Sequence, residues 1–450
     1  MTSTSPDTQL TQSLDNAQVR TDVSLKDLTT LRIGGRIAQY VETQTEADLI
    51  AAVTYADEHA LPLLVIGGGS NIIASDTPFE GLVVRDARSG VVVDQVDSCG
   101  GGSVTVPAGH NWDSFVVEAI AQGWVGIESL IGIPGTVGAA PVQNIGAYGN
   151  EVSSVISSVR VWDRGEQRKR TFALFELEFA YRDSRIKRTM MTGDENGRVW
   201  GPTPRYVVLE VSFQFRLGTR SAPVQYGELA RLLGVQVGER ANTRDIAEAV
   251  LKLRGGKGML EDSFGRPQVA GTAGARGALP QGLVVNDDAE LAACGDGGVS
   301  APAATATTLI SDDSALTNPQ YDRWSAGSFF MNPIVDAAAA DALPEGAPRY
   351  PVASNKPAVT TGPSVNAVDE SKVKTSAAWL IQNAGFDRGF GVHGDDSAAT
   401  LSSVHTLALT NRGNATSDDI VELARTVREG VRGKFGITLE PEPVTVGLTI

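Results

Sequence analysis

The stretch that decides the fold reads VIGGGSN, residues 65–71, where three consecutive glycines follow an apolar run typical of a buried strand. Glycine tolerates positive φ, so such a turn can direct several backbone N–H groups at one anion. The serine and the asparagine can add hydrogen bonds to a diphosphate. We predict a phosphate-binding turn formed by Gly67, Gly68, Gly69, Ser70 and Asn71. A plain glycine turn between two strands is the alternative.

A second glycine-rich stretch reads IPGTVGAAPVQNIGAYG, residues 133–149. Its small residues allow the backbone to approach a flat ligand closely, although tight packing of a helix on a sheet would need the same pattern. The two stretches flank one strand–helix unit, which favours a dinucleotide cofactor. The first stretch lacks the spacing of a Rossmann fingerprint or a P-loop, which indicates a different fold. The cofactor-binding residues predicted in the second stretch are Pro134, Gly135, Thr136, Gly138, Gly146 and Ala147.

The rest of the sequence predicts an α+β fold, with strands concentrated in the first half and helices in the second. Thr45 is a suitable N-cap for an alanine-rich helix over residues 46–59. Apolar residues alternate through 206–215, as in a strand with one buried face. Further helices are expected at 112–120, 226–233, 243–254, 376–383 and 417–432.

The composition argues against several classes of function. The 450 residues carry a net charge of −15, which disfavours nucleic acid because phosphate contacts need a basic face. The chain has no apolar run of about 18 residues, and its polar N-terminus lacks a signal peptide's apolar core, so we expect no membrane segment and a cytoplasmic location. The four histidines lack metal-ligand spacing, so we predict no metal site. Two cysteines, Cys99 and Cys294, argue against a disulfide framework.

Three further motifs carry a specific resemblance. They are YRDSRIK at residues 181–187, AGSFFMNP at 326–333 and LEPE at 439–442. In this order, and after the two glycine stretches, they resemble the UDP-N-acetylenolpyruvoylglucosamine reductase family, also called the UDP-N-acetylmuramate dehydrogenases. The FAD-binding half of that family is similar to that of vanillyl-alcohol oxidase. The resemblance runs from about Leu28 to the C-terminus.

The resemblance implies a two-subdomain FAD-binding fold of the vanillyl-alcohol oxidase type, followed by an α+β substrate-binding domain. We expect a disordered tail at 1–20, FAD-binding subdomains at 21–88 and 89–219, and a substrate-binding domain at 220–436. A C-terminal segment, 437–450, is expected to return to the FAD half. Residues 262–318 are rich in Ala, Gly, Thr and Asp without a sustained period, which predicts a disordered insertion.

The resemblance also implies an activity. NADPH reduces non-covalently bound FAD, which then reduces the enolpyruvyl ether of UDP-N-acetylglucosamine to UDP-N-acetylmuramate. By residue-to-residue match, Ser328 is the proton donor and Arg182 is the cation that stabilises an enolate-like intermediate. Glu442 matches the family's glutamate; facing a dianionic intermediate it helps only when protonated, so we predict that its pKa is raised. The alternative roles are structural: a turn hydroxyl, a salt bridge of Arg182 with Asp183 or Asp163, and a polar strand end.

The same resemblance suggests the substrate-binding residues. Tyr226 matches a tyrosine that lies over the diphosphate in part of the family, and Lys257 matches a lysine after the helix that ends near Arg254. Asn332 matches an asparagine near the substrate. Tyr350 is expected on the uridine side, and a basic residue at or near Arg388 is expected at the diphosphate.

Two other functions stay open. A sugar or aldonolactone oxidase of the same flavin fold would consume oxygen, ignore NADPH and need neither Ser328 nor Glu442. A non-catalytic flavin or UDP-sugar sensor would have no use for a proton donor. We expect the chain to act as a monomer.

Overall fold

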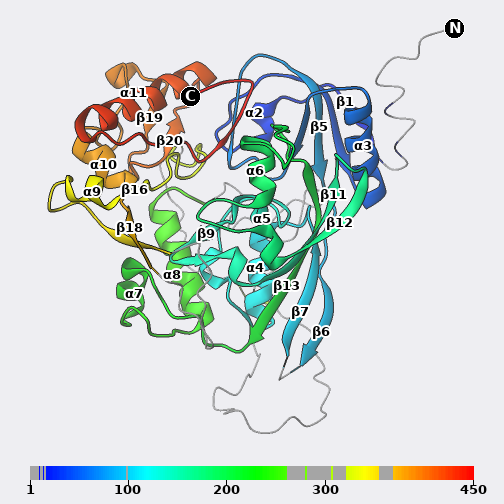
Figure 1. The fold of residues 1–450 in the computed structure, drawn as a ribbon, viewed down its shortest axis with the longest axis horizontal. Helices are drawn as coiled ribbons and strands as arrows, with labels where there is room; N and C mark the ends of the chain where they lie inside the picture. The colour runs from blue at the N-terminus through cyan, green and yellow to red at the C-terminus, as the bar shows by residue number, and fades with distance from the viewer. Residues whose placement is uncertain are drawn as a thin grey trace. The chain divides into compact units, whose positions relative to one another are not determined.

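In the computed structural model the chain forms two compact units, each with its own hydrophobic core. The structure describes residues 10, 14, 17–97, 100–260, 279–280, 306–307, 321–353 and 368–450. The first unit comprises the described parts of Met1–Val23, Arg36–Gly69 and Pro78–Asn318, and the second comprises Ser24–Gly35, Ser70–Thr77 and the described parts of Pro319–Ile450 (Figure 1). Most of the predicted tail and insertion, and both cysteines, lie outside the described residues.

The first unit is built on two sheets. The smaller has the strand order β1-β2-β5-β3, in which β2, β5 and β3 run parallel and β1 is antiparallel to β2. The larger is antiparallel, with the order β12-β11-β13-β7-β6 and β8 paired to β13. The strands are β1 Val19–Arg20, β2 Ile37–Thr43, β3 Leu63–Ile66, β5 Phe79–Asp86, β6 Val92–Asp97, β7 Gly101–Pro107, β8 Trp124–Val125, β9 Gly146–Ala147, β10 Asn150–Glu151, β11 Ile156–Asp163, β12 Arg168–Ala173, β13 Tyr206–Leu217, β14 Leu279–Pro280 and β15 Ala306–Thr307.

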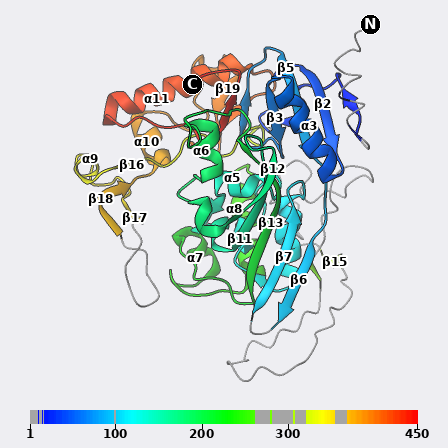
Figure 2. The same ribbon diagram turned by 45° about the vertical axis from the view of Figure 1, so that its right-hand side comes forward.

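Helix α3 covers the smaller sheet, as Figure 2 shows. The predicted N-cap is confirmed, because Thr45 Oγ1 accepts a hydrogen bond from the Asp48 N–H at 3.0 Å. Leu49 and Val53 of this helix share a buried cluster with Leu82 of β5. The helices of this unit are α3 Glu46–Glu58, α4 Trp112–Ala121, α5 Ala139–Gln143, α6 Arg185–Met191, α7 Gly227–Leu233 and α8 Thr243–Gly256, with 3-10 turns η1 Glu128–Leu130, η2 Val152–Ser154 and η3 Leu174–Leu177.

Strand β13 contributes to two cores in the first unit. The predicted alternation holds over Val211–Phe215, where alternate side chains enter the core against α4. Nearer its start, both faces are buried, which the alternation did not predict. Val207 and Leu209 join the cluster under α3, whereas Tyr206 joins the cluster under α4. A register irregularity between β11 and β13 lies in this region and re-aims the side chains.

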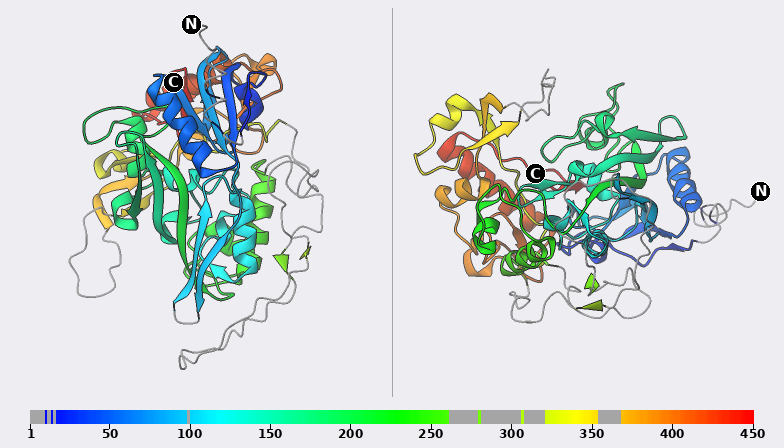
Figure 3. Two further views of the ribbon diagram at one scale, coloured as in Figure 1. Left: turned by 90° about the vertical axis from the view of Figure 1, so that its right-hand side faces the viewer. Right: turned by 90° about the horizontal axis from the view of Figure 1, so that it is seen from below.

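In the second unit more residues lie in helices than in strands, and Figure 3 shows its elements from two further sides. Its core gathers Phe329 and Phe330 with apolar residues of α10 and α11. The C-terminal strand β21 pairs in parallel with β4, Val444 lying opposite Ile72. No helix in the described part of the chain is long and apolar enough to cross a membrane. The elements are α2 Leu25–Leu28, β4 Ile72–Ala74, β16 Ile334–Asp336, α9 Ala337–Asp341, β17 Tyr350–Ala353, β18 Val368–Lys374, α10 Ala377–Ala384, η5 Gly394–Asp396, β19 Ala399–Leu401, β20 Leu409–Asn411, α11 Ser417–Phe435 and β21 Val444–Val446.

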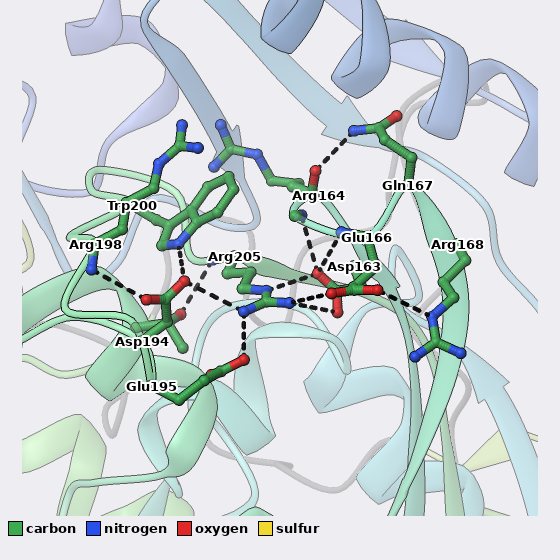
Figure 4. A network of polar contacts seen from close by, with 12 residues as sticks. Asp163, Arg164, Glu166, Gln167, Arg168, Asp194, Glu195, Arg198, Trp200 and Arg205 are labelled. Atoms are coloured by element: carbon green, nitrogen blue, oxygen red, sulfur yellow. Dashed lines mark hydrogen bonds and ion pairs between the residues drawn. The ribbon is translucent and has the colours of Figure 1, made fainter.

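A buried ion pair connects β11 to the start of β13 in the larger sheet (Figure 4). The Arg205 guanidinium donates to both carboxylate oxygens of Asp163, at 2.7 and 3.1 Å, and the two side chains are 5% and 0% exposed. Arg205 also reaches Glu195 at 2.6 Å and Asp194 at 3.3 Å. A hydrogen bond from the Trp200 indole N–H lowers the pKa of Asp194 and keeps it anionic beside this cation.

This geometry predicts a large cost for Asp163→Asn, because the substitution leaves the Arg205 charge buried without its bidentate partner. We expect the free energy of unfolding to fall by about 1.5–3 kcal/mol, measured by denaturant melts, since Asp194 and Glu195 still pair with the guanidinium. Glu166→Gln is the matched control, since Glu166 meets the same guanidinium at 3.6 Å but is 53% exposed. The control should cost less than about 1 kcal/mol. Equal losses in the two variants would show that burial of the pair does not govern its contribution.

Candidate functional site

The two predicted cofactor stretches meet within the first unit. A Cβ built on Gly68 would lie 2.7 Å from the Gly135 Cα, and one built on Gly67 would lie 2.7 Å from the Thr136 hydroxyl. Side chains at these positions would therefore force the stretches apart. The glycines thus permit close contact between the two stretches, and the phosphate-binding role of the first stays a prediction.

Backbone hydrogen bonds hold the second stretch against the loop that precedes α4. The Gly138 N–H donates to the Ala108 carbonyl at 2.8 Å, and the Gly135 carbonyl accepts from the Trp112 N–H at 3.1 Å. A Cβ on Gly138 would lie only 2.4 Å from the Ala108 Cβ. Tight packing, the alternative to a cofactor-binding role, therefore applies to Gly138 itself. Pro134 lies next to Gly135 in the sequence.

The second half of this stretch forms a small hairpin, β9 with β10, that includes predicted cofactor residues Gly146 and Ala147. The Gly146 carbonyl accepts a hydrogen bond from Arg182 Nη2 at 2.6 Å. A Cβ at Gly146 would lie 3.0 Å from Arg182 Nη1, so glycine leaves room for the guanidinium. The structure thus joins a predicted cofactor residue to a predicted catalytic residue in the same unit.

The two aspartates named as alternative partners for Arg182 each pair with another arginine. Asp183 pairs with Arg188 at 2.5 Å, and Asp163 pairs with Arg205 at 2.7 Å. Arg182 instead occupies a tight turn with φ of 55°, a left-handed conformation unusual for a residue with a side chain.

The segments that carry Ser328 and Glu442 pair in the second unit, although the two residues lie 114 positions apart in the sequence. The Glu442 N–H donates to the Phe329 carbonyl at 2.8 Å, and the Met331 N–H donates to the Glu440 carbonyl at 3.0 Å. The LEPE motif therefore runs antiparallel to the segment that follows Ser328. This pairing places the two motifs side by side within the second unit.

The residues next to Ser328 explain how it is held. Gly327 has φ of 72°, which turns the chain immediately before the serine. Phe329 and Phe330 are almost fully buried, and their rings lie 5.0 Å apart in an edge-to-face arrangement. The two phenylalanines therefore anchor this segment in the core of the second unit, whereas Ser328 itself stays partly exposed.

Ser70 and Asn71 belong to the second unit, unlike the three glycines before them. The Asn71 carbonyl accepts a hydrogen bond from the Val444 N–H at 2.9 Å, two residues after Glu442. Their predicted contact with a cofactor stays a prediction.

In the first unit, Tyr226 and Lys257 both lie close to Tyr148, a residue to which the sequence patterns assign no role. The Tyr148 and Tyr226 rings meet edge to face at 5.5 Å, and Lys257 Nζ lies 6.0 Å from the Tyr148 ring centre. Lys257 Nζ also forms an ion pair with Glu228 at 2.8 Å. Burial raises the pKa of Tyr148, with smaller opposing contributions from Arg254 and Lys257. The position of Tyr148 inside the quoted glycine stretch was the signal that could have identified it.

The remaining predicted substrate residues are in the second unit. Asn332 Oδ1 accepts a hydrogen bond from the Ala377 N–H at 3.0 Å, so it supports the start of α10. Tyr350 lies on β17 and is 48% exposed, and Arg388 is exposed after α10. Among the described residues of this unit, neither is joined to Ser328 or Glu442 by a backbone hydrogen bond. The substrate contacts of Asn332, Tyr350 and Arg388 stay predictions. In the described part of the chain, no group of three or more His, Cys, Asp or Glu side chains could hold a metal ion.

Comparison with known proteins identifies relatives along nearly the whole chain. Residues 318–446 match the C-terminal domain of UDP-N-acetylenolpyruvoylglucosamine reductase, and residues 9–171 match an FAD binding domain. The UDP-N-acetylenolpyruvoylglucosamine reductase of Cutibacterium acnes is 44% identical over 95% of this chain and 90% of its own length. The protein of that name from Streptomyces avermitilis is 37% identical, with 98% of each chain covered. A crystal structure of the Thermus caldophilus reductase (MurB) is 21% identical, with a TM-score of 0.49 over 95% of this chain and 99% of that chain.

The Lys257–Glu228 pair predicts competition for the lysine. If Lys257 binds a diphosphate, Glu228→Gln should strengthen UDP binding, because the anion then displaces no carboxylate. An exposed or half-buried pair contributes roughly 0.2–1 kcal/mol, so the dissociation constant should fall up to about fivefold. Isothermal titration with UDP at low salt measures this change.

Glu248→Gln on the exposed side of α8 is the matched control, since it removes the same charge from the same unit. An equal gain in affinity for the control would mean that only net charge matters. Weaker UDP binding by Glu228→Gln would contradict the competition model.

Proposed function

Because the chain belongs to the UDP-N-acetylenolpyruvoylglucosamine reductase family, we propose that it reduces UDP-N-acetylglucosamine enolpyruvate to UDP-N-acetylmuramate with electrons from NADPH. This product is a precursor of peptidoglycan. We further propose that the protein works as a monomer in the cytoplasm. The observation that carries the proposal is the hydrogen-bonded pairing of the Ser328 segment with the Glu442 segment.

The residues present fit FAD as the cofactor. Gly68 faces the backbone of Gly135 and Gly67 faces the Thr136 hydroxyl, so the two stretches form a wall of backbone and small side chains. Such a wall suits a diphosphate held by N–H groups. We propose that Gly67, Gly68, Gly69, Ser70, Asn71, Pro134, Gly135, Thr136, Gly138, Gly146 and Ala147 hold it without a covalent bond. When bound, FAD supplies the means of passing hydride from NADPH to the substrate carbon.

In this proposal Ser328 donates the proton that completes the reduction. A serine hydroxyl is a weak acid, but the carbon that it protonates is strongly basic after hydride addition, so a neutral, well-placed donor suffices. The placement comes from buried neighbours, since Phe329 and Phe330 fix the backbone next to the hydroxyl. A serine on an exposed loop would lack this constraint.

Arg182 and Glu442 would stabilise the charge that hydride addition creates. The substrate carboxylate becomes part of a dianionic, enolate-like group, which a fixed guanidinium stabilises because it needs no reorganisation during the reaction. Glu442, which matches the family's glutamate, would face the same group. Tyr226, Lys257, Asn332, Tyr350 and Arg388 are proposed to bind the rest of the UDP-sugar.

Ser328→Ala tests the proton donor. We expect flavin reduction by NADPH to keep its rate, whereas substrate reduction falls by roughly 10²–10⁴-fold because a positioned acid is lost. Stopped-flow absorbance separates the two half-reactions in the holoenzyme. Ser371→Ala, an exposed serine on β18, is the control and should leave both rates unchanged.

The outcomes distinguish the competing functions. Equal loss of both half-reactions in Ser328→Ala would give the serine a structural role. A wild-type protein that oxidises sugars with oxygen and ignores NADPH would be an oxidase, and one that binds flavin without turnover would be a sensor. Protein purified without flavin would sink the proposal altogether.

A further inference from the structure

Lys187 closes the YRDSRIK motif, yet the proposed reaction gives it no task. The residue is only 9% exposed, which is unusual for lysine because burying an ammonium group costs free energy unless it is well bonded. Its Nζ donates a hydrogen bond to the backbone carbonyl of Arg182 at 3.0 Å. The buried charge is therefore directed at the peptide group of the proposed catalytic arginine.

The carbonyl that Lys187 binds belongs to a strained turn. The Ala180 and Asp183 backbones exchange hydrogen bonds at 3.0 and 3.1 Å, which leaves Tyr181 and Arg182 as the two turn residues. Arg182 has φ of 55°, and this left-handed conformation costs roughly 1–2 kcal/mol for a residue with a Cβ. Such a conformation persists only where its surroundings hold it in place.

The backbone of Lys187 is itself held in place by hydrogen bonds at the start of α6. Its N–H donates to Ser184 Oγ at 3.1 Å, and the same hydroxyl donates to the Val142 carbonyl at 2.8 Å. Ser184 is fully buried, so the first turn of α6 is fixed to the glycine-rich stretch. The backbone of Lys187 is thus fixed, and its ammonium group reaches the Arg182 carbonyl.

Other contacts hold the ends of the turn. Asn144 Nδ2 donates to the Ala180 carbonyl at 2.9 Å, and Arg188 pairs with Asp183 at 2.5 Å. Lys187 differs because it binds the peptide group immediately after the Arg182 Cα. The orientation of that peptide group and the direction of the arginine side chain are linked through one residue's φ and ψ. The guanidinium ends against the Gly146 carbonyl at 2.6 Å.

We propose that Lys187 is a positioning residue that keeps Arg182 in its left-handed conformation and so aims the guanidinium at the substrate carboxylate. This inference rests on the proposed function, in which Arg182 stabilises the enolate-like intermediate. Without the ammonium group, the Arg182 peptide can rotate to relieve its strain, and the guanidinium leaves its place beside Gly146. The loss falls on the rate of substrate reduction, because the charge matters most when the intermediate forms.

A double-mutant cycle with Lys187→Met and Arg182→Ala tests this coupling in the flavin-loaded enzyme. We expect Lys187→Met to slow substrate reduction at saturation by about tenfold, while the half-saturating substrate concentration changes by less than about threefold. Flavin reduction by NADPH should be unchanged within about twofold. In the Arg182→Ala background, adding Lys187→Met should cause no further loss, because the lysine acts through the arginine. Lys252→Met, an exposed lysine on α8, is the control.

Each outcome decides between the inference and its premise. Multiplicative losses in the double variant, or equal slowing of both half-reactions by Lys187→Met, would make Lys187 a structural residue and overturn the inference. Lys187→Arg, which keeps a cationic donor, should recover most of the lost rate, and no recovery would also overturn it. If Arg182→Ala leaves substrate reduction unchanged, the proposed function of Arg182 fails instead.

Discussion

The contact between the two glycine stretches is the constraint on which the first unit depends. Gly67 and Gly68 follow β3, the parallel strand at the edge of the smaller sheet, and meet Gly135 and Thr136 at distances that a Cβ would violate. This contact also sets the position of the rest of the second stretch. That includes the β9–β10 hairpin, where the Gly146 carbonyl accepts a hydrogen bond from the Arg182 guanidinium. A side chain at Gly68 would therefore displace the predicted phosphate turn and also disturb the support of a residue more than a hundred positions along the chain.

The catalytic candidates are distributed over both units, and each unit prepares its own part. In the first, a strained turn and a carbonyl acceptor define where the Arg182 charge lies. In the second, two buried phenylalanines and an antiparallel pairing define where Ser328 and Glu442 lie. Within each unit, backbone hydrogen bonds and burial fix the chain that carries the candidate residues.

Local rules predicted much of the fold. The Thr45 cap and the alanine-rich helix α3 follow from neighbouring residues, and so does the alternation in the second part of β13. The first part of β13 could not be predicted in this way, because its second buried face depends on packing with α3, a segment far away in sequence. The resemblance identified the residues of the proposed site, and long-range hydrogen bonding then showed which of them share a unit and a backbone ladder.

Partners of charged residues were the least predictable feature. Lys257 and Arg182 were both assigned to anionic ligands, yet the structure gives the lysine a carboxylate partner and the arginine a backbone carbonyl. No period or motif encodes these choices, since Glu228 and Gly146 lie at unrelated sequence distances. Lys187 could not be identified from the sequence for the same reason. Within YRDSRIK it resembles an ordinary surface cation, and only its burial and its hydrogen bond to the Arg182 carbonyl distinguish it. The motif then acts as one unit, in which Lys187 holds the backbone conformation of Arg182.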